Sequence, residues 1–166
     1  MTQKNKSLSD SILEEISMKG LGFAKKPNYE IPSLPRDITE LDDPALMDLF
    51  VQLSQWNDYA SGLYAVACVN EREAESALET AQAIGCISGW TGAKGETATK
   101  VKAAAAASPE IQKLSKELNV FYAHRKLLES RTMDIERSAA LVSRELTRRS
   151  AGSSGGFRTR QRNFTT

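Results

Sequence analysis

Apolar side chains recur at alternating spacings of three and four residues along two long stretches of the chain. The first stretch covers residues 44–84, and Asn70 is the only polar member of its repeat. Such spacing keeps one face of a helix turned toward another helix, so a long helix with a long partner is predicted. Asp42, Asp43 and Pro44 supply a start signal. The repeat consists of Leu46, Leu49, Leu53, Trp56, Ala60, Leu63, Ala67, Asn70, Ala74, Ala77, Ala81 and Ile84.

A second repeat of the same kind covers residues 111–146, with Arg125 and Thr132 as its polar members. Residues 85–95 separate the two repeats, and their four glycines predict a turn. The sequence therefore predicts an all-α fold, a long antiparallel, coiled-coil-like helical hairpin over residues 44–149. The second repeat consists of Ile111, Leu114, Leu118, Phe121, Arg125, Leu128, Thr132, Ile135, Ala139, Val142 and Leu146.

The connection between the repeats has helix propensity of its own over residues 96–107. Pro109 then either kinks a continuing helix or begins a new one, because proline lacks a backbone donor but suits a first turn. If the turn centres near residue 94, Leu63 lies near Arg125 in the hairpin.

Polar residues at seam positions commonly fix the register or the oligomeric state of paired helices. Asn70 and Arg125 are expected to do so here, with a functional contact as the alternative. The seam expected to hold the hairpin and its oligomer together comprises Leu49, Leu53, Trp56, Leu63, Asn70, Leu118, Phe121, Arg125 and Leu128.

A hairpin of two helices buries only one stripe on each helix, and large apolar side chains remain outside both repeats. Amphipathic helices with such surplus apolar flanks tend to self-associate. A homo-oligomer with a multi-helix core is therefore predicted. The surplus residues are Tyr59, Tyr64, Val66, Val69, Leu78, Tyr122, Leu127, Met133 and Leu141.

Flexible arms are predicted on both sides of the hairpin. In the N-terminal arm, residues 1–43, a short amphipathic helix is expected over residues 9–19, capped by Ser9 or Asp10. So short a helix needs a docking surface, either its own hairpin or a partner protein on which it folds. Three prolines make residues 25–43 an extended linker. The apolar side of the short helix comprises Ile12, Leu13 and Ile16.

The C-terminal end is strongly basic. The second long helix is expected to end after Arg149, and residues 150–166 form a flexible tail by composition. Residues 144–166 carry six arginines against one acid, Glu145. Arginines interleaved with aromatic rings suit single-stranded nucleic acid, because guanidinium groups pair with phosphates and bases stack on rings. The alternative is a solubilising tail. The candidate nucleic-acid-binding residues are Arg144, Arg148, Arg149, Phe157, Arg158, Arg160, Arg162 and Phe164.

The sequence offers little for enzymatic chemistry. His124 is the only histidine, and Cys68 and Cys86 have no metal-ligand spacing. No phosphate-binding glycine loop, nucleophile elbow or zincin motif is found in the sequence. Glu71 and Glu75 are expected to lie on a solvated stripe. We therefore predict no catalytic residue, no metal and no cofactor, and a hydrolase that uses His124 is the least favoured alternative.

No apolar run approaches the roughly 18 residues of a membrane span, and the N-terminal residues contain no signal-peptide core. We therefore expect no membrane partner, a cytoplasmic location and reduced thiols at both cysteines. Net charge at neutral pH is +1, but positive charge rises toward the C-terminus, which is typical of a folded body with a basic arm.

The tryptophan-containing first repeat, the glycine-bearing turn and residues 103–149 together resemble small phage proteins related to the recombination mediator UvsY. The second block reads AAAAASPEIQKLSKEL, then HRKLLESRTMDIERSAALVSRELTRR. The resemblance implies a helical oligomer that binds single-stranded DNA and helps to load a RecA-like recombinase against single-strand-binding protein. That family carries basic residues around the end of the first helix, where this chain has the uncharged residues 81–84. The C-terminal arginines are the substitute expected here.

The leading hypothesis is a non-enzymatic phage recombination mediator that binds single-stranded DNA in the cytoplasm of the host cell. Its partners would be single-stranded DNA, a RecA-like recombinase or single-strand-binding protein, and further copies of itself. The alternative is an oligomeric helical module that binds only protein, such as a virion assembly factor or an inhibitor of host defence.

Overall fold

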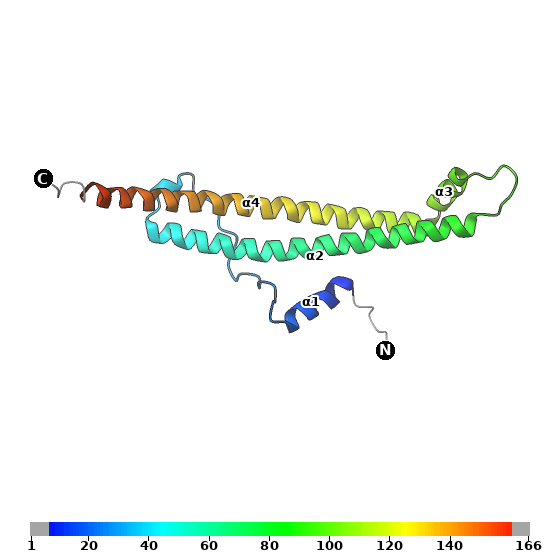
Figure 1. Cartoon of the computed structure of the whole chain (residues 1–166), viewed down its shortest axis with the longest axis horizontal. Helices are drawn as coiled ribbons and strands as arrows, with labels where there is room; N and C mark the ends of the chain where they lie inside the picture. The colour runs from blue at the N-terminus through cyan, green and yellow to red at the C-terminus, as the bar shows by residue number, and fades with distance from the viewer. Residues whose placement is uncertain (1–6, 161–166) are drawn as a thin grey trace. The chain divides into compact units, whose positions relative to one another are not determined.

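The structure, a computed structural model, describes residues 7–160, with side chains over residues 7–152. In this range the chain is all-helical and contains no β-strand (Figure 1). No helix in it is both long enough and apolar enough to cross a membrane. The helices are α1 (Leu8–Met18), a 3-10 turn η1 (Ile38–Glu40), α2 (Asp43–Gly89), α3 (Ala98–Ala106) and α4 (Pro109–Arg160).

The described chain divides into two compact units. Unit 1 contains the residues up to Gly22 together with Leu63–Glu129, and therefore includes α1, α3 and one part of each long helix. Unit 2 contains Phe23–Gly62 and the residues from Ser130 onward.

Helix α1 begins and ends with recognisable capping signals. Ser7 is its N-cap, and the Ser7 side chain accepts a hydrogen bond from the backbone N–H of Asp10. The expected caps, Ser9 and Asp10, are wrong, because the helix begins earlier than predicted. At the C-terminal end Gly20 has a φ of +76°, and the N–H groups of Gly20 and Leu21 donate to the carbonyls of Ser17 and Ile16. This Schellman-type closure explains why the helix stops before Gly20.

Helix α2 starts where the sequence predicts but runs further. The Asp42 side chain accepts from the N–H of Ala45 at 2.8 Å and so caps the helix. The helix then continues through Gly85 to Gly89, so the prediction that Gly85 opens the turn is wrong. A Cβ at Gly85 would lie 3.2 Å from the Cβ of Ala105 in α3. Gly85 is therefore a close-packing position within the helix.

The chain reverses after α2 in a loop that closes on Glu96. The Glu96 carboxylate accepts hydrogen bonds from the backbone N–H groups of Thr91, at 3.0 Å, and Gly92, at 2.7 Å. Gly92 and Gly95 have φ values of +74° and +88°, which glycine adopts without the penalty of a Cβ. These hydrogen bonds therefore hold the conformation of the loop that connects α2 to α3.

Pro109 begins a new helix, which resolves the alternative left open by the sequence. The Ser108 side chain accepts from the N–H of Ile111 at 3.3 Å, so Ser108 is the N-cap. The opposite end of α4 differs from the prediction, since the helix continues to Arg160 and does not end after Arg149. No proline interrupts residues 150–160, and a helix that is already formed gains one hydrogen bond for each residue added.

The core of unit 2 joins the first part of α2 to the last part of α4. Leu46, Leu53 and Trp56 from α2 are buried against Ile135 and Val142 from α4. The segment before α2 packs on the same cluster, with half-buried apolar residues from the predicted extended linker. These residues are Tyr29, Ile31, Leu34, Ile38 and Leu41.

The pattern of burial follows the predicted repeat closely in α4 and only partly in α2. Every predicted seam position from Ile111 to Leu146 is buried or half-buried. In α2, however, Leu63, Ala77 and Ile84 are exposed. An α-helix has 3.6 residues per turn, so positions chosen at a strict 3-4 spacing rotate around the helix axis by about 20° per heptad.

The buried face of α2 is shifted by one residue at these three positions in unit 1. The residues that follow Leu63, Ala77 and Ile84 in the sequence, Tyr64, Leu78 and Gly85, are half-buried instead. The seam prediction is therefore wrong for Leu63.

Candidate functional site

Arg149, one of the predicted nucleic-acid contacts, is an internal tie within unit 2. Its Nη1 donates to Asp43 Oδ1 at 2.7 Å and to the carbonyl of Leu41 at 2.8 Å, and its Nη2 donates to the carbonyl of Thr39 at 3.0 Å. These bonds tie α4 to the chain that precedes α2. The geometry therefore gives Arg149 a role in the fold, and these hydrogen bonds engage its guanidinium group within unit 2.

Glu145 neutralises part of the basic end. Its side chain is buried, and its carboxylate accepts from Arg148 Nε at 2.7 Å, Arg148 Nη2 at 2.6 Å and Arg149 Nε at 2.8 Å. The hydrogen bonds from Arg148 and then Arg149 lower the pKa of Glu145 to about 2. A buried carboxylate that remains ionised in this way neutralises part of the positive charge of Arg148 and Arg149.

Two of the predicted arginines face solvent at the described end of α4. Arg144 is exposed, and the Arg148 side chain is 67% exposed although it is paired with Glu145. For Phe157, Arg158 and Arg160 the structure describes only a helical backbone. Arg162 and Phe164 lie outside the described residues.

Arg125 is the centre of a polar cluster in unit 1. Its guanidinium group forms an ion pair with Glu71 of α2 and a longer one, at 3.3 Å, with Glu129. It also lies 5.5 Å from the ring centroid of Tyr122. The hydrogen bond to Glu71 is the main reason why the pKa of Arg125 is raised. Arg125 therefore remains a cation that pairs α4 with α2, and its partner is Glu71, not the region of Leu63.

Glu71 was expected on a solvated stripe and instead lies at this helix–helix contact. Its side chain is 19% exposed, against 45% for Glu75, which pairs with Arg72 on the surface. Asn70, the other polar seam residue, is half-buried. The 3-4 repeat places Asn70 on the face of α2 that packs against α4. Because the buried face of α2 is shifted by one residue in unit 1, Glu71 lies at this contact as well. A search for carboxylates one position from Asn70 would have found the partner of Arg125.

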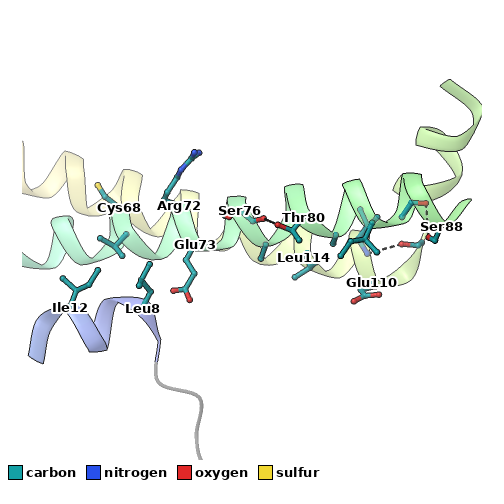
Figure 2. Close-up of a pocket in the computed structure, with 17 residues that line it drawn as sticks. Leu8, Ile12, Cys68, Arg72, Glu73, Ser76, Thr80, Ser88, Glu110 and Leu114 are labelled. Carbon is teal, nitrogen blue, oxygen red and sulfur yellow. Dashed lines mark hydrogen bonds between the residues drawn. The ribbon is translucent and has the colours of Figure 1, made fainter. Parts of the chain in front are cut away.

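An apolar groove of about 1230 Å³ lies in unit 1 between α1, α2 and α4. Helix α1 contributes Leu8 and Ile12, which point toward α2 near Cys68 and Glu73 (Figure 2). The predicted partner-binding side of α1 is thus turned to its own unit, with Leu13 and Ile16 half-buried. Sequence reasoning missed the groove. Its only trace in the sequence is the run of small residues Ser76, Ala77, Thr80, Ala81, Gly85 and Ser88.

The remaining residues with chemical potential lie apart. His124 is exposed, and Cys68 and Cys86 are half-buried free thiols. A hydrogen bond with Cys68 raises the pKa of Tyr64. Over residues 7–160 no group of three or more His, Cys, Asp or Glu side chains is arranged to hold a metal ion.

No protein-family profile, curated protein or solved structure matches the chain. The geometry described above leaves two candidate surfaces. One is formed by the exposed arginines of α4 in unit 2, and the other is the apolar groove of unit 1.

Proposed function

We propose that this chain is a non-enzymatic helical protein that binds single-stranded DNA through the basic end of α4. The observation that carries the proposal is the exposure of Arg144 and Arg148, one turn apart on α4. Arg158, Arg160 and Arg162 follow them in the sequence, and Phe157 and Phe164 are interleaved. Arginine pairs with backbone phosphates whatever the sequence of the strand, and aromatic rings stack on bases.

We further propose that α2 and α4 form one antiparallel hairpin and that several copies assemble around it. Within unit 1 the contacts already run in opposite directions, since Arg125 meets Glu71 whereas Ile111 meets Gly85. Assembly would place several basic ends on one strand, and linked weak contacts gain affinity through effective concentration. Together with the resemblance to UvsY-related phage proteins, this supports a mediator that helps load a RecA-like recombinase against single-strand-binding protein.

The second candidate function is an oligomeric helical module that binds only protein. The apolar groove of unit 1 favours it, because large exposed apolar surfaces commonly mark protein contacts. This module would bind no nucleic acid at any salt concentration, which separates the two candidates.

Fluorescence anisotropy of a labelled single-stranded oligonucleotide tests the proposal. We expect binding that weakens steeply with salt, and a shallower salt dependence in the double variant Arg144→Gln/Arg148→Gln. Arg137→Gln is the matched control, because Arg137 is an exposed arginine of the same helix that pairs with Asp134 at 3.6 Å. Absence of binding at low salt, or equal losses in the double variant and the control, would overturn the proposal.

A further inference from the structure

We infer that the open part of the groove in unit 1 receives the outer face of α4 from unit 1 of a second copy of this chain. The inference rests on the self-association included in the proposed function and is independent of DNA binding. The contact would join the groove of one copy to the outer face of α4 on another copy, and both of these surfaces belong to unit 1.

The groove extends well beyond α1. Its α2 wall runs from Cys68 to Ser88, about 30 Å at ~1.5 Å per residue. Helix α1 reaches this wall only through Leu8 and Ile12, near the Cys68 end (Figure 2). Farther along, small side chains such as those of Ala77 and Ala81 line the wall, and small side chains allow another helix to approach closely.

The outer face of α4 in unit 1 carries an apolar stripe, formed by Val120 and Leu127, that no other described residue covers. Val120 is 66% exposed and Leu127 is 72% exposed. These residues are seven apart, so they lie on the same side of the helix. The face of α4 that contains Ile111 and Leu114, which line the groove, is on the opposite side. Each copy therefore carries a groove and a stripe that do not compete for the same residues.

The charges around the two surfaces are complementary. The groove is bordered by the exposed carboxylates of Glu73 and Glu110 and by Arg72, whose charge is paired with Glu75. The outer face of α4 carries the exposed ammonium groups of Lys113 and Lys116, with Glu117 at its edge. Opposite charges at the rim of a contact favour one partner and one orientation. The occupant that fits is thus a helix with an apolar stripe and lysines beside it, which this chain itself supplies.

A contact between two different surfaces is heterologous. Such a contact leaves a free groove on one copy and a free stripe on the other, so it continues into a ring or a filament. A closed two-fold dimer would need the groove and the stripe of one copy to face the same partner, and these surfaces lie on opposite sides of α4.

A charge-exchange experiment on the full chain tests the inference. One variant, Lys113→Glu/Lys116→Glu, has an acidic stripe and the native groove, and the other, Glu73→Lys/Glu110→Lys, has the native stripe and a basic groove. Each variant alone brings like charges together and is expected to lose assembly at concentrations where the native chain assembles. An equimolar mixture is expected to assemble again, because each stripe then meets a groove of opposite charge.

Analytical ultracentrifugation measures assembly, and circular dichroism checks that each variant keeps its helices. The matched control is Lys126→Glu, which changes a lysine of the same helix that pairs with Glu129 at 2.9 Å. A native chain that stays monomeric, variants that assemble like the native chain, or a mixture that does not recover would each overturn the inference. The DNA anisotropy of the same variants separates this outcome from a failure of the proposed function, because Arg144 and Arg148 are unchanged in all of them.

Discussion

The two units pair parts of the same two helices with different chemistry. In unit 2, large apolar side chains such as Leu46, Leu53 and Val142 are almost completely buried. In unit 1 the buried side chains are fewer and mostly smaller, with Ala67 and Val101 among them, and a half-buried ion pair joins the helices. Apolar burial stabilises roughly in proportion to area, so stability is concentrated in unit 2. Unit 1 keeps apolar surface available for other contacts.

Shortening a buried side chain in the core of unit 2 should destabilise the protein more than any other change considered below. Leu53 is 1% exposed, so Leu53→Ala should lower the free energy of unfolding by about 3 kcal/mol through lost burial and a new cavity. Leu63, in the same helix but in unit 1, is 39% exposed, and Leu63→Ala should cost about 1 kcal/mol or less. Urea denaturation followed by circular dichroism measures both values. Equal losses in the two variants would contradict the contrast between the units.

The contrast between these leucines also shows what the sequence could predict. Both are members of one 3-4 repeat; Leu53 is buried, and every position of the corresponding repeat in α4 is buried or half-buried. The repeat fails for Leu63, because an α-helix has 3.6 residues per turn and a strict 3-4 count drifts away from the buried face along α2. The charge count likewise predicted a basic end, but only the folded chain brings Arg149 to Asp43 and Thr39.

The groove of unit 1 could not be predicted from the sequence for a related reason. A groove is produced by the spacing between helices, and the periodicity of each helix leaves that spacing undetermined. The N-terminal helix was predicted from its apolar side, yet the surface on which it docks includes Cys68 and Glu73, distant in the sequence. Local signals therefore located the helices, and the contacts between them required the structure.

The ion pairs of Glu145 with Arg148 and Arg149 should make the stability of unit 2 depend on pH. The pKa of Glu145 is lowered from its ordinary 4.5 to about 2, so ionised Glu145 stabilises the fold fully above about pH 4.5. This contribution is lost as the pH falls from 4.5 toward 2, because the unfolded chain takes up the proton first. Glu145→Gln removes the titration, so the urea midpoint of the variant should fall less steeply over this range.

Glu136→Gln is the control for this measurement, since Glu136 is an exposed glutamate of the same helix. Its urea midpoint should follow the native curve between pH 4.5 and 2. If Glu145→Gln also followed the native curve, the ion pairs with Arg148 and Arg149 would not be part of the stability of unit 2.

The smallest expected effect concerns the close approach of α2 and α3 in unit 1. Replacing glycine by alanine within a helix usually stabilises it by up to about 1 kcal/mol. At Gly85 the new Cβ would lie 3.2 Å from the Cβ of Ala105, so α3 must move slightly, whereas at Gly89 the nearest atom is Val101 Cγ1 at 3.4 Å. Gly85→Ala should therefore gain less stability than Gly89→Ala, by under about 1 kcal/mol, in thermal unfolding. A larger gain at Gly85 would contradict this expectation, because it would mean that α3 moves away from the new Cβ at little cost in free energy. The contact between α2 and α3 at Gly85 would then be as loosely packed as the rest of unit 1.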